Sequence, residues 1–162
     1  MNSVDPRARR WLAAATIAAG LLCATVILIP PAEQRGFVAA SWLRLGFRPA
    51  CHQITHRCLD LGSGPLPICA RCAGLYAGSL GGLLATLLSG RRFQPRLGWL
   101  VAAGAPSVID FIFGFVNLPT LANWPRFALA LLPGLLAGLL LADAVCQLAG
   151  DHHDQTGQSG IT

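Results

Sequence analysis

Four long apolar stretches constrain this chain more than any other feature. They cover about residues 11–29, 67–88, 97–118 and 125–148. Each is close to the roughly 20 residues with which a helix crosses a hydrocarbon core about 30 Å thick. Hydrophobic residues make up 54% of the chain and charged residues only 12%, too few charges to cover a soluble domain. We therefore predict an all-α fold, an integral membrane bundle of four transmembrane helices in contact with a lipid bilayer.

The segments around these stretches complete the predicted organisation. The first helix should end at the Pro30–Pro31 pair, because proline disrupts a helix interior. Residues 1–10 would be a cytoplasmic N-terminus, 11–148 a single membrane domain with a Cys/His loop at 49–66, and 149–162 a disordered polar tail. A cleaved signal peptide is the alternative for 11–29, but the apolar run is longer than such a peptide needs and no A-x-A site follows.

Arginine placement bears on both partners and orientation. The net charge is +5 and the chain has no lysine. The arginines lie at the ends of apolar stretches and not on one soluble face with aromatic residues between them, so we expect no nucleic-acid partner. Under the positive-inside rule, six of them place both termini in the cytoplasm. These are Arg7, Arg9, Arg10, Arg91, Arg92 and Arg96. Four arginines in the first loop argue partly for the opposite orientation.

A short helix in the membrane interface is predicted between the first two stretches. Residues 34–47 place Phe37, Val38, Trp42 and Leu45 at helical spacing, with arginines nearby. An apolar face beside basic residues is typical of an amphipathic helix that lies in the plane of the interface.

Small residues indicate which helices touch. Gly74, Gly78 and Gly82 form a tandem G-x-x-x-G, and Gly134 and Gly138 repeat the pattern. Small residues at this spacing let helix backbones approach closely in lipid. We expect the helices of 67–88 and 125–148 to pack together. The alternative is that the first three glycines bind a second copy of the chain or a protein partner.

Three charges fall at membrane depth, where an unpaired charge costs several kcal/mol. Asp110 lies late in the third stretch, Arg71 at the start of the second and Arg126 at the start of the fourth. We predict a buried ion pair of Asp110 with Arg126 or Arg71. It is either purely structural or has a part in charge balance or proton transfer.

The run from Cys51 to Cys72 gathers four thiols and two imidazoles in an otherwise ligand-poor chain. Cys69 and Cys72 are three residues apart at a helix start, which puts both sulfurs on one face, where the helix N-terminus stabilises thiolate. Cys51 and the adjacent His52 would need an irregular turn to share one ion.

If residues 49–58 are helical instead, Cys51 and Cys58 share a face, as do His52 and His56. Either arrangement completes a four-ligand set with the C-x-x-C pair, as in Cys₃His or Cys₄ sites of zinc and some iron proteins. A dithiol/disulfide pair and merely structural thiols are the alternatives.

C-H-Q-I-T-H-R followed by L-P-I-C-A-R-C-A-G-L-Y-A-G resembles the bacterial and archaeal membrane-protein family called domain of unknown function 2085. Its pattern reads C-H-Q-x-x-x-R-S and then L-C-A-R-C-x-G-I-Y-x-G. The resemblance implies a multi-pass protein of the cell (inner) membrane with a Cys/His motif, and no established activity. The matching positions are Cys51, His52, Gln53, Arg57, Cys69, Arg71, Cys72, Gly74, Tyr76, Gly78, Asp110, Asn123 and Arg126.

Where the family pattern has serine, this chain has Cys58. That departure favours Cys51, His52, Cys69 and Cys72 as the ligands, with Cys58 and His56 as possible additions. Gln53, Arg57, Arg71 and Tyr76 would then orient the ligands and offset thiolate charge.

Two classes of function follow. The first is a membrane protein that binds a metal ion, zinc or iron, at the extracytoplasmic end of the bundle. The second is a membrane thiol-disulfide oxidoreductase that uses the Cys69/Cys72 pair. Metal is favoured because His52 serves naturally as a ligand but has no task in a thiol relay. A transporter is a third class, but this sequence lacks the paired repeats that are typical of transporter folds.

Overall fold

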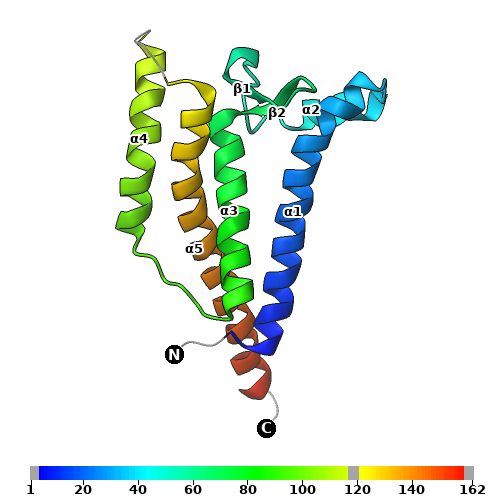
Figure 1. The fold of residues 1–162 in the computed structure, drawn as a ribbon. Coiled ribbons are helices and arrows are strands. Elements are labelled where there is room, and N and C mark those ends of the chain that lie inside the picture. Colours follow the sequence, from blue (N-terminus) through cyan, green and yellow to red (C-terminus); the bar gives the residue numbers. More distant parts are fainter. Residues whose placement is uncertain (1–3, 117–120, 159–162) are drawn as a thin grey trace.

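A computed structural model describes residues 4–116 and 121–158 of the chain. In chain order its elements are α1 (Pro6–Gln34), α2 (Val38–Gly46), the 3-10 helix η1 (Thr55–Arg57), β1 (Cys58–Asp60), β2 (Pro65–Cys69), α3 (Ala70–Ser89), α4 (Leu97–Phe115) and α5 (Asn123–Gln158). Helices α3 and α5 pack along each other, α1 contacts both, and α4 contacts α5. Figure 1 shows α2 and the strands together at one end of this bundle, while α1 begins and α5 ends at the other.

The described chain is mainly helical, as predicted, with one short hairpin of two strands. Three helices are long and apolar enough to cross a membrane: α1, α3 and the part of α5 up to Ala149. Helix α4 is apolar but shorter, so its role as a fourth span stays a prediction. Residues 117 and 118, at the end of the predicted third stretch, lie outside the described residues.

Helix α1 is longer at both ends than the predicted 11–29. It starts at Pro6 because the Asp5 side chain accepts a hydrogen bond from the Arg7 N–H (2.9 Å), with proline at the first helical position. The predicted end at Pro30–Pro31 is wrong, since the helix continues to Gln34. Proline has the backbone φ of a helix, and an ion pair between Glu33 and Arg44 of α2 (2.7 Å) holds the last turn.

The segment expected to begin the second helix is a strand. Residues Pro65–Cys69 pair antiparallel with Cys58–Asp60, with Cys58 opposite Cys69, so α3 starts only at Ala70. The Asp60 carboxylate accepts hydrogen bonds from the backbone N–H groups of Gly62 (2.7 Å) and Gly64 (3.2 Å). Both glycines have φ of +91°, a conformation that other residues rarely adopt. The hairpin begins within the Cys/His loop predicted for 49–66 and extends to Cys69.

The end of α5 also differs from expectation. The helix runs to Gln158, within the segment predicted as a disordered tail, and residues 159–162 lie outside the described residues.

The glycine pattern forms the seam between α3 and α5, which confirms that these two helices touch. A Cβ atom built on Gly78 would lie 2.3 Å from the Leu131 carbonyl oxygen, and one on Gly82 would lie 2.4 Å from that of Leu135. Gly74 likewise faces the backbone of α5. The glycine face proposed as an alternative surface for a partner is therefore filled by α5.

Candidate metal and thiol site

Two segments of the chain meet where the thiols lie. After α2 the Cys51 N–H donates to the Phe47 carbonyl (3.0 Å), and Gln53 then adopts a positive φ of 52°, which is uncommon for a residue other than glycine. The backbone is therefore irregular here, as a shared site for the adjacent Cys51 and His52 would require, but only Cys51 joins the other cysteines. The β1–β2 hairpin returns the chain to the same place, because Cys69 ends β2 directly before α3.

Three cysteines converge at this point. The Sγ atoms of Cys51, Cys69 and Cys72 all lie within 4.8 Å of one another. The Cys69 N–H donates to the Cys51 sulfur (3.2 Å), and the sulfurs of Cys69 and Cys72 are 3.5 Å apart. Cys51 is buried, the other two are partly buried, and all three are free thiols. We call these residues the thiol triad.

Within the thiol triad, the surroundings of Cys69 favour its thiolate form. A hydrogen bond with the Cys72 thiol, together with backbone N–H groups at the start of α3, lowers the pKa of Cys69 to about 5, although burial opposes this shift. In contrast, burial and the neighbouring Cys51 and Cys69 raise the pKa of Cys58 to about 11. At neutral pH we therefore expect Cys69 to be the thiolate of the metal-free protein.

This difference predicts the pH dependence of alkylation. In metal-free protein, Cys69 should react with iodoacetamide at pH 6, since that pH lies above its pKa of about 5 and the thiolate predominates. Cys58 should stay unmodified there, because its pKa of about 11 keeps it a thiol. Peptide mass spectrometry after timed labelling measures both rates. Equal labelling of the two cysteines at pH 6 would contradict the assignment.

The other predicted ligands lie apart from the triad. Among the described residues, the cluster of ligand atoms contains neither imidazole and not Cys58. His52 and His56 are exposed. The Cys58 thiol donates to the Ile54 carbonyl instead (3.4 Å). His52 does, however, line the same cavity as the three thiols.

That cavity has a volume of about 550 Å³ and lies between the loop before η1 and the starts of α3 and α5. Arginines line it beside the thiols: Arg57, Arg71 and Arg126. Gln53 also lines it, but its side-chain amide donates to the Arg44 carbonyl (2.6 Å) and so holds the turn to α2. Tyr76, predicted to support the ligands, lines a different cavity.

A buried carboxylate lies beside this cavity. Asp110 of α4 is 5% exposed and pairs with both Arg71 and Arg126, the latter at 3.0 Å between Nε and Oδ2. Its other oxygen accepts from the Leu121 N–H (2.9 Å). One carboxylate thus joins α3, α4 and α5, where the sequence predicted a pair with either arginine.

Two polar contacts that the sequence analysis did not anticipate hold the hairpin in place. Arg44 donates to the Pro65 carbonyl (2.9 Å) while it pairs with Glu33. The Asn123 amide donates to the carbonyls of His56 (3.1 Å) and Cys58 (2.9 Å). Asn123 lies in N-W-P-R at the start of α5, one of the segments that carry the family resemblance. No comparable local signal links Arg44 to Pro65, which lies 21 residues away.

Comparison with known proteins gives a family and nothing closer. No curated protein and no solved structure matches the chain. A family model described as a predicted membrane protein, domain of unknown function 2085, matches residues 51–142. This range includes the thiol triad, the Asp110 ion pairs and most of the α3–α5 seam, and it covers more than half of the 162 residues. The chain therefore belongs to the domain of unknown function 2085 family of predicted membrane proteins.

Proposed function

We propose that this protein binds one metal ion, zinc or iron, through Cys51, Cys69 and Cys72. The observation that carries the proposal is the convergence of three sulfurs, from segments 18 residues apart, to within 4.8 Å of one another. Sulfurs that share a tetrahedral zinc lie roughly 3.8 Å apart, given bonds of about 2.3 Å. Small rotations of the side chains bring the triad to that spacing.

The surroundings favour an ion over three unbound thiols. Cys51 is 6% exposed and the backbone N–H of Cys69 points at its sulfur, so the cluster is held in place and partly shielded from solvent. Soft thiolate ligands favour zinc and iron over calcium and magnesium. The nearby arginines would offset the negative charge of three thiolates on a divalent ion.

The fourth coordination position would face the cavity that His52 lines. A rotation of His52 inward completes a Cys₃His site, which would tie the hairpin to the bundle as structural zinc does. If the position stays open, the ion can accept an external ligand or be handed onward. Both versions use the same three sulfurs.

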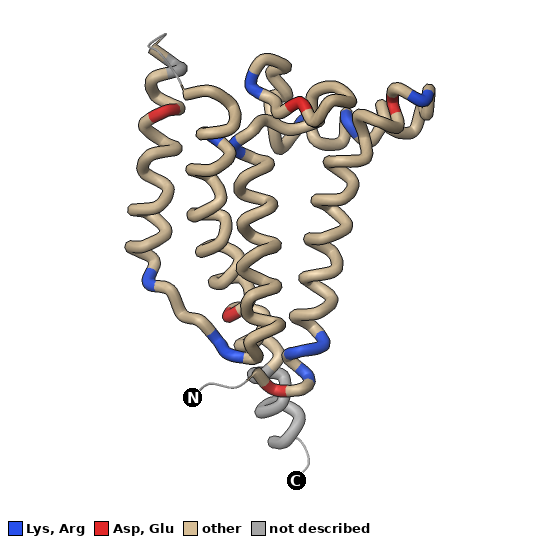
Figure 2. The backbone as a smooth tube through the Cα atoms, viewed as in Figure 1, with Lys and Arg blue, Asp and Glu red and all other residues tan. Residues whose placement is uncertain are grey.

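We place this site at the extracytoplasmic end of the bundle, in the inner membrane of a bacterial or archaeal cell. Figure 2 shows the arginines in the first turns of α1 and those between α3 and α4 at the end opposite the hairpin, and the positive-inside rule puts that end in the cytoplasm. Helix α4 would be the fourth span, because Asp110 ties it to the starts of α3 and α5. Helix α2 would lie in the interface with Trp42, 71% exposed, toward lipid.

A thiol-disulfide oxidoreductase is the second candidate, and the low pKa of Cys69 favours it. The Cys69 thiolate would attack a disulfide of a partner protein, forming a mixed disulfide and releasing one partner thiol. Cys72, with its sulfur 3.5 Å away, would then displace the second partner thiol. The partner is reduced by two electrons, and Cys69–Cys72 becomes the disulfide.

Elemental analysis of the detergent-purified protein, together with a count of free thiols, distinguishes these candidates. We expect one zinc or iron per chain, lost in Cys51→Ser, Cys69→Ser and Cys72→Ser. Two control variants outside the triad, Cys23→Ser and Cys58→Ser, should keep the metal. Metal-free wild-type protein whose Cys69 and Cys72 oxidise reversibly would support the oxidoreductase. Metal that persists in all three triad variants would refute the site.

A further inference from the structure

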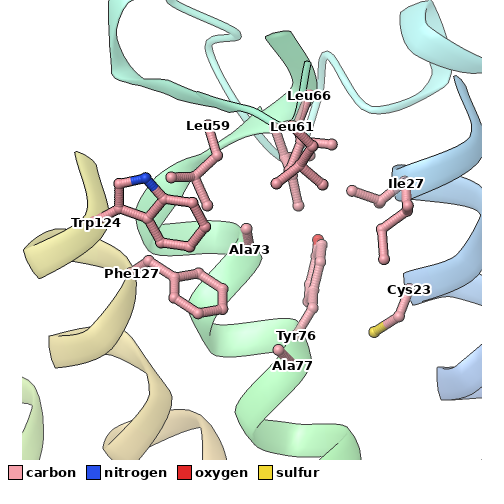
Figure 3. A pocket seen from close by; sticks show the side chains of 12 residues that line it. Cys23, Ile27, Leu59, Leu61, Leu66, Ala73, Tyr76, Ala77, Trp124 and Phe127 are labelled. Atoms are coloured by element: carbon pink, nitrogen blue, oxygen red, sulfur yellow. The ribbon is translucent and has the colours of Figure 1, made fainter. Parts of the chain in front are cut away.

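A second cavity lies beneath the hairpin, on the side of α3 that faces α1. It has a volume of about 150 Å³ and is lined by α1, β1, β2, α3 and α5. Its walls are apolar, and Figure 3 shows Leu59, Leu61 and Leu66 above it, Cys23 and Ile27 on one side and Trp124 and Phe127 on the other. Several of these residues belong to the buried cluster that also holds Cys51. Nothing in the proposed metal site uses this space.

The size of the cavity restricts what fits. An apolar cavity of about 150 Å³ is large enough for benzene. A single six-membered ring is therefore the appropriate size for the enclosed part of this space. Trp124 and Phe127 form an edge-to-face pair with their ring centroids 6.0 Å apart, which gives one wall the aromatic surface that a planar ring packs against.

The Tyr76 hydroxyl defines the chemistry of the ring. The Tyr76 hydroxyl is the only side-chain oxygen among the described residues that line the cavity. In Figure 3 it points into the cavity, toward Leu61 and Leu66, which offer no side-chain acceptor. A tyrosine hydroxyl in apolar surroundings usually has a hydrogen-bond partner. A ring with an oxygen acceptor at its edge would supply one, and an acyl chain would not.

The entrance is apolar as well. Three lining residues are substantially exposed, namely Ile27 (51%), Leu61 (49%) and Trp124 (59%). Ile27 and Trp124 belong to candidate membrane spans, so their exposed surfaces, on either side of the cavity, face lipid when those helices cross a bilayer. A ligand would therefore enter from the membrane and could leave an apolar tail there.

From these features we infer that the cavity binds the ring of a lipid-soluble benzoquinone. The ring would lie against Trp124 and Phe127, one carbonyl oxygen would accept a hydrogen bond from the Tyr76 hydroxyl, and the apolar tail would extend past Ile27 into the bilayer. This site is separate from the thiol triad and its occupancy does not depend on a metal there.

Quenching of Trp124 fluorescence by decylubiquinone tests the inference. The parent protein carries Trp11→Phe, Trp42→Phe and Trp99→Phe, which leaves Trp124 as the single tryptophan. Its quenching in detergent should saturate at one quinone per chain. Ala77→Leu fills the cavity and should weaken binding at least tenfold, whereas Ala85→Leu, at an exposed position of the same helix, should not. Tyr76→Phe should weaken binding about threefold to tenfold through the lost hydrogen bond.

Other outcomes would overturn the proposal. Equal quenching in the parent and in Ala77→Leu would mean that the quinone acts from the micelle and not from the cavity. Displacement by excess decane would identify an acyl-chain site. If thermal unfolding shows that Ala77→Leu is misfolded, Tyr76→Phe decides, and an unchanged affinity refutes the quinone assignment. The titration should give the same affinity in Cys69→Ser, which lacks one of the proposed metal ligands. This variant therefore separates the quinone proposal from the metal proposal.

Discussion

Substituting Gly78 with alanine should lower the free energy of unfolding by about 3 kcal/mol, the upper end of the range for overpacked cores. The new Cβ would lie 2.3 Å from the Leu131 carbonyl oxygen, 2.8 Å from the Leu135 nitrogen and 2.9 Å from the Gly134 Cα. All three are backbone atoms, so no side chain can rotate away and α3 must move off α5. Thermal or denaturant unfolding of the detergent-solubilised protein, followed by circular dichroism, measures the loss.

A matched control lies three residues further along the same helix. A Cβ on Gly81 would meet only the Leu135 side chain at 3.5 Å, an ordinary contact distance. Gly81→Ala should therefore leave the protein as stable as the wild type, or up to about 1 kcal/mol more stable through helix propensity. Equal stabilities for the Gly78 and Gly81 variants would show that the α3–α5 seam does not depend on close backbone contact.

Replacing Asp110 with leucine should cost about 3 to 5 kcal/mol, the range observed when one partner of a buried ion pair is removed. Asp110 is the carboxylate that pairs with both Arg71 and Arg126, and Arg126 is itself only 5% exposed. The substitution leaves the buried guanidinium group of Arg126 and the partly buried one of Arg71 without their anion. It also removes the acceptor for the Leu121 N–H, so the link from α4 to α5 should loosen. The same unfolding measurement applies.

Two further variants test the cause of that loss. Arg71→Met and Arg126→Met, added to Asp110→Leu, remove all three charges and should restore most of the stability, because an apolar replacement of a whole buried ionic cluster is often neutral. Asp5→Asn, an exposed N-cap where asparagine serves equally well, should change little. A triple variant as unstable as Asp110→Leu would show that lost packing, and not unpaired charge, causes the effect.

Much of the bundle could be predicted from local sequence. The apolar runs identify α1, α3, α4 and α5 because a helix that lies in lipid must be apolar over about 20 residues, wherever its neighbours are. The spacing of Gly74, Gly78 and Gly82 likewise identifies the face of α3 that packs against another helix, since the pattern needs only helical geometry. Both signals are contained within single segments of the chain.

The ends of the helices could not be predicted in the same way, because they depend on contacts between segments that are distant in the sequence. Pro30 and Pro31 do not end α1, where Arg44 pairs with Glu33 to hold the last turn. Pro65–Cys69 is a strand because Cys58–Asp60 lies beside it. The glycines after Asp60 signal the turn between these segments, but not their pairing as strands.

For the candidate site, the sequence by itself determined which residue types are present: four thiols and two imidazoles in one short region, with two arginines near helix starts and one aspartate late in an apolar stretch. Only the tertiary structure decided which of them meet. The positive φ at Gln53 and the return of the hairpin bring Cys51 to Cys69 and Cys72, while Cys58 and both histidines stay outside the triad. Ligand chemistry belongs to single side chains, but convergence within 4.8 Å depends on backbone turns and on helix packing between distant segments.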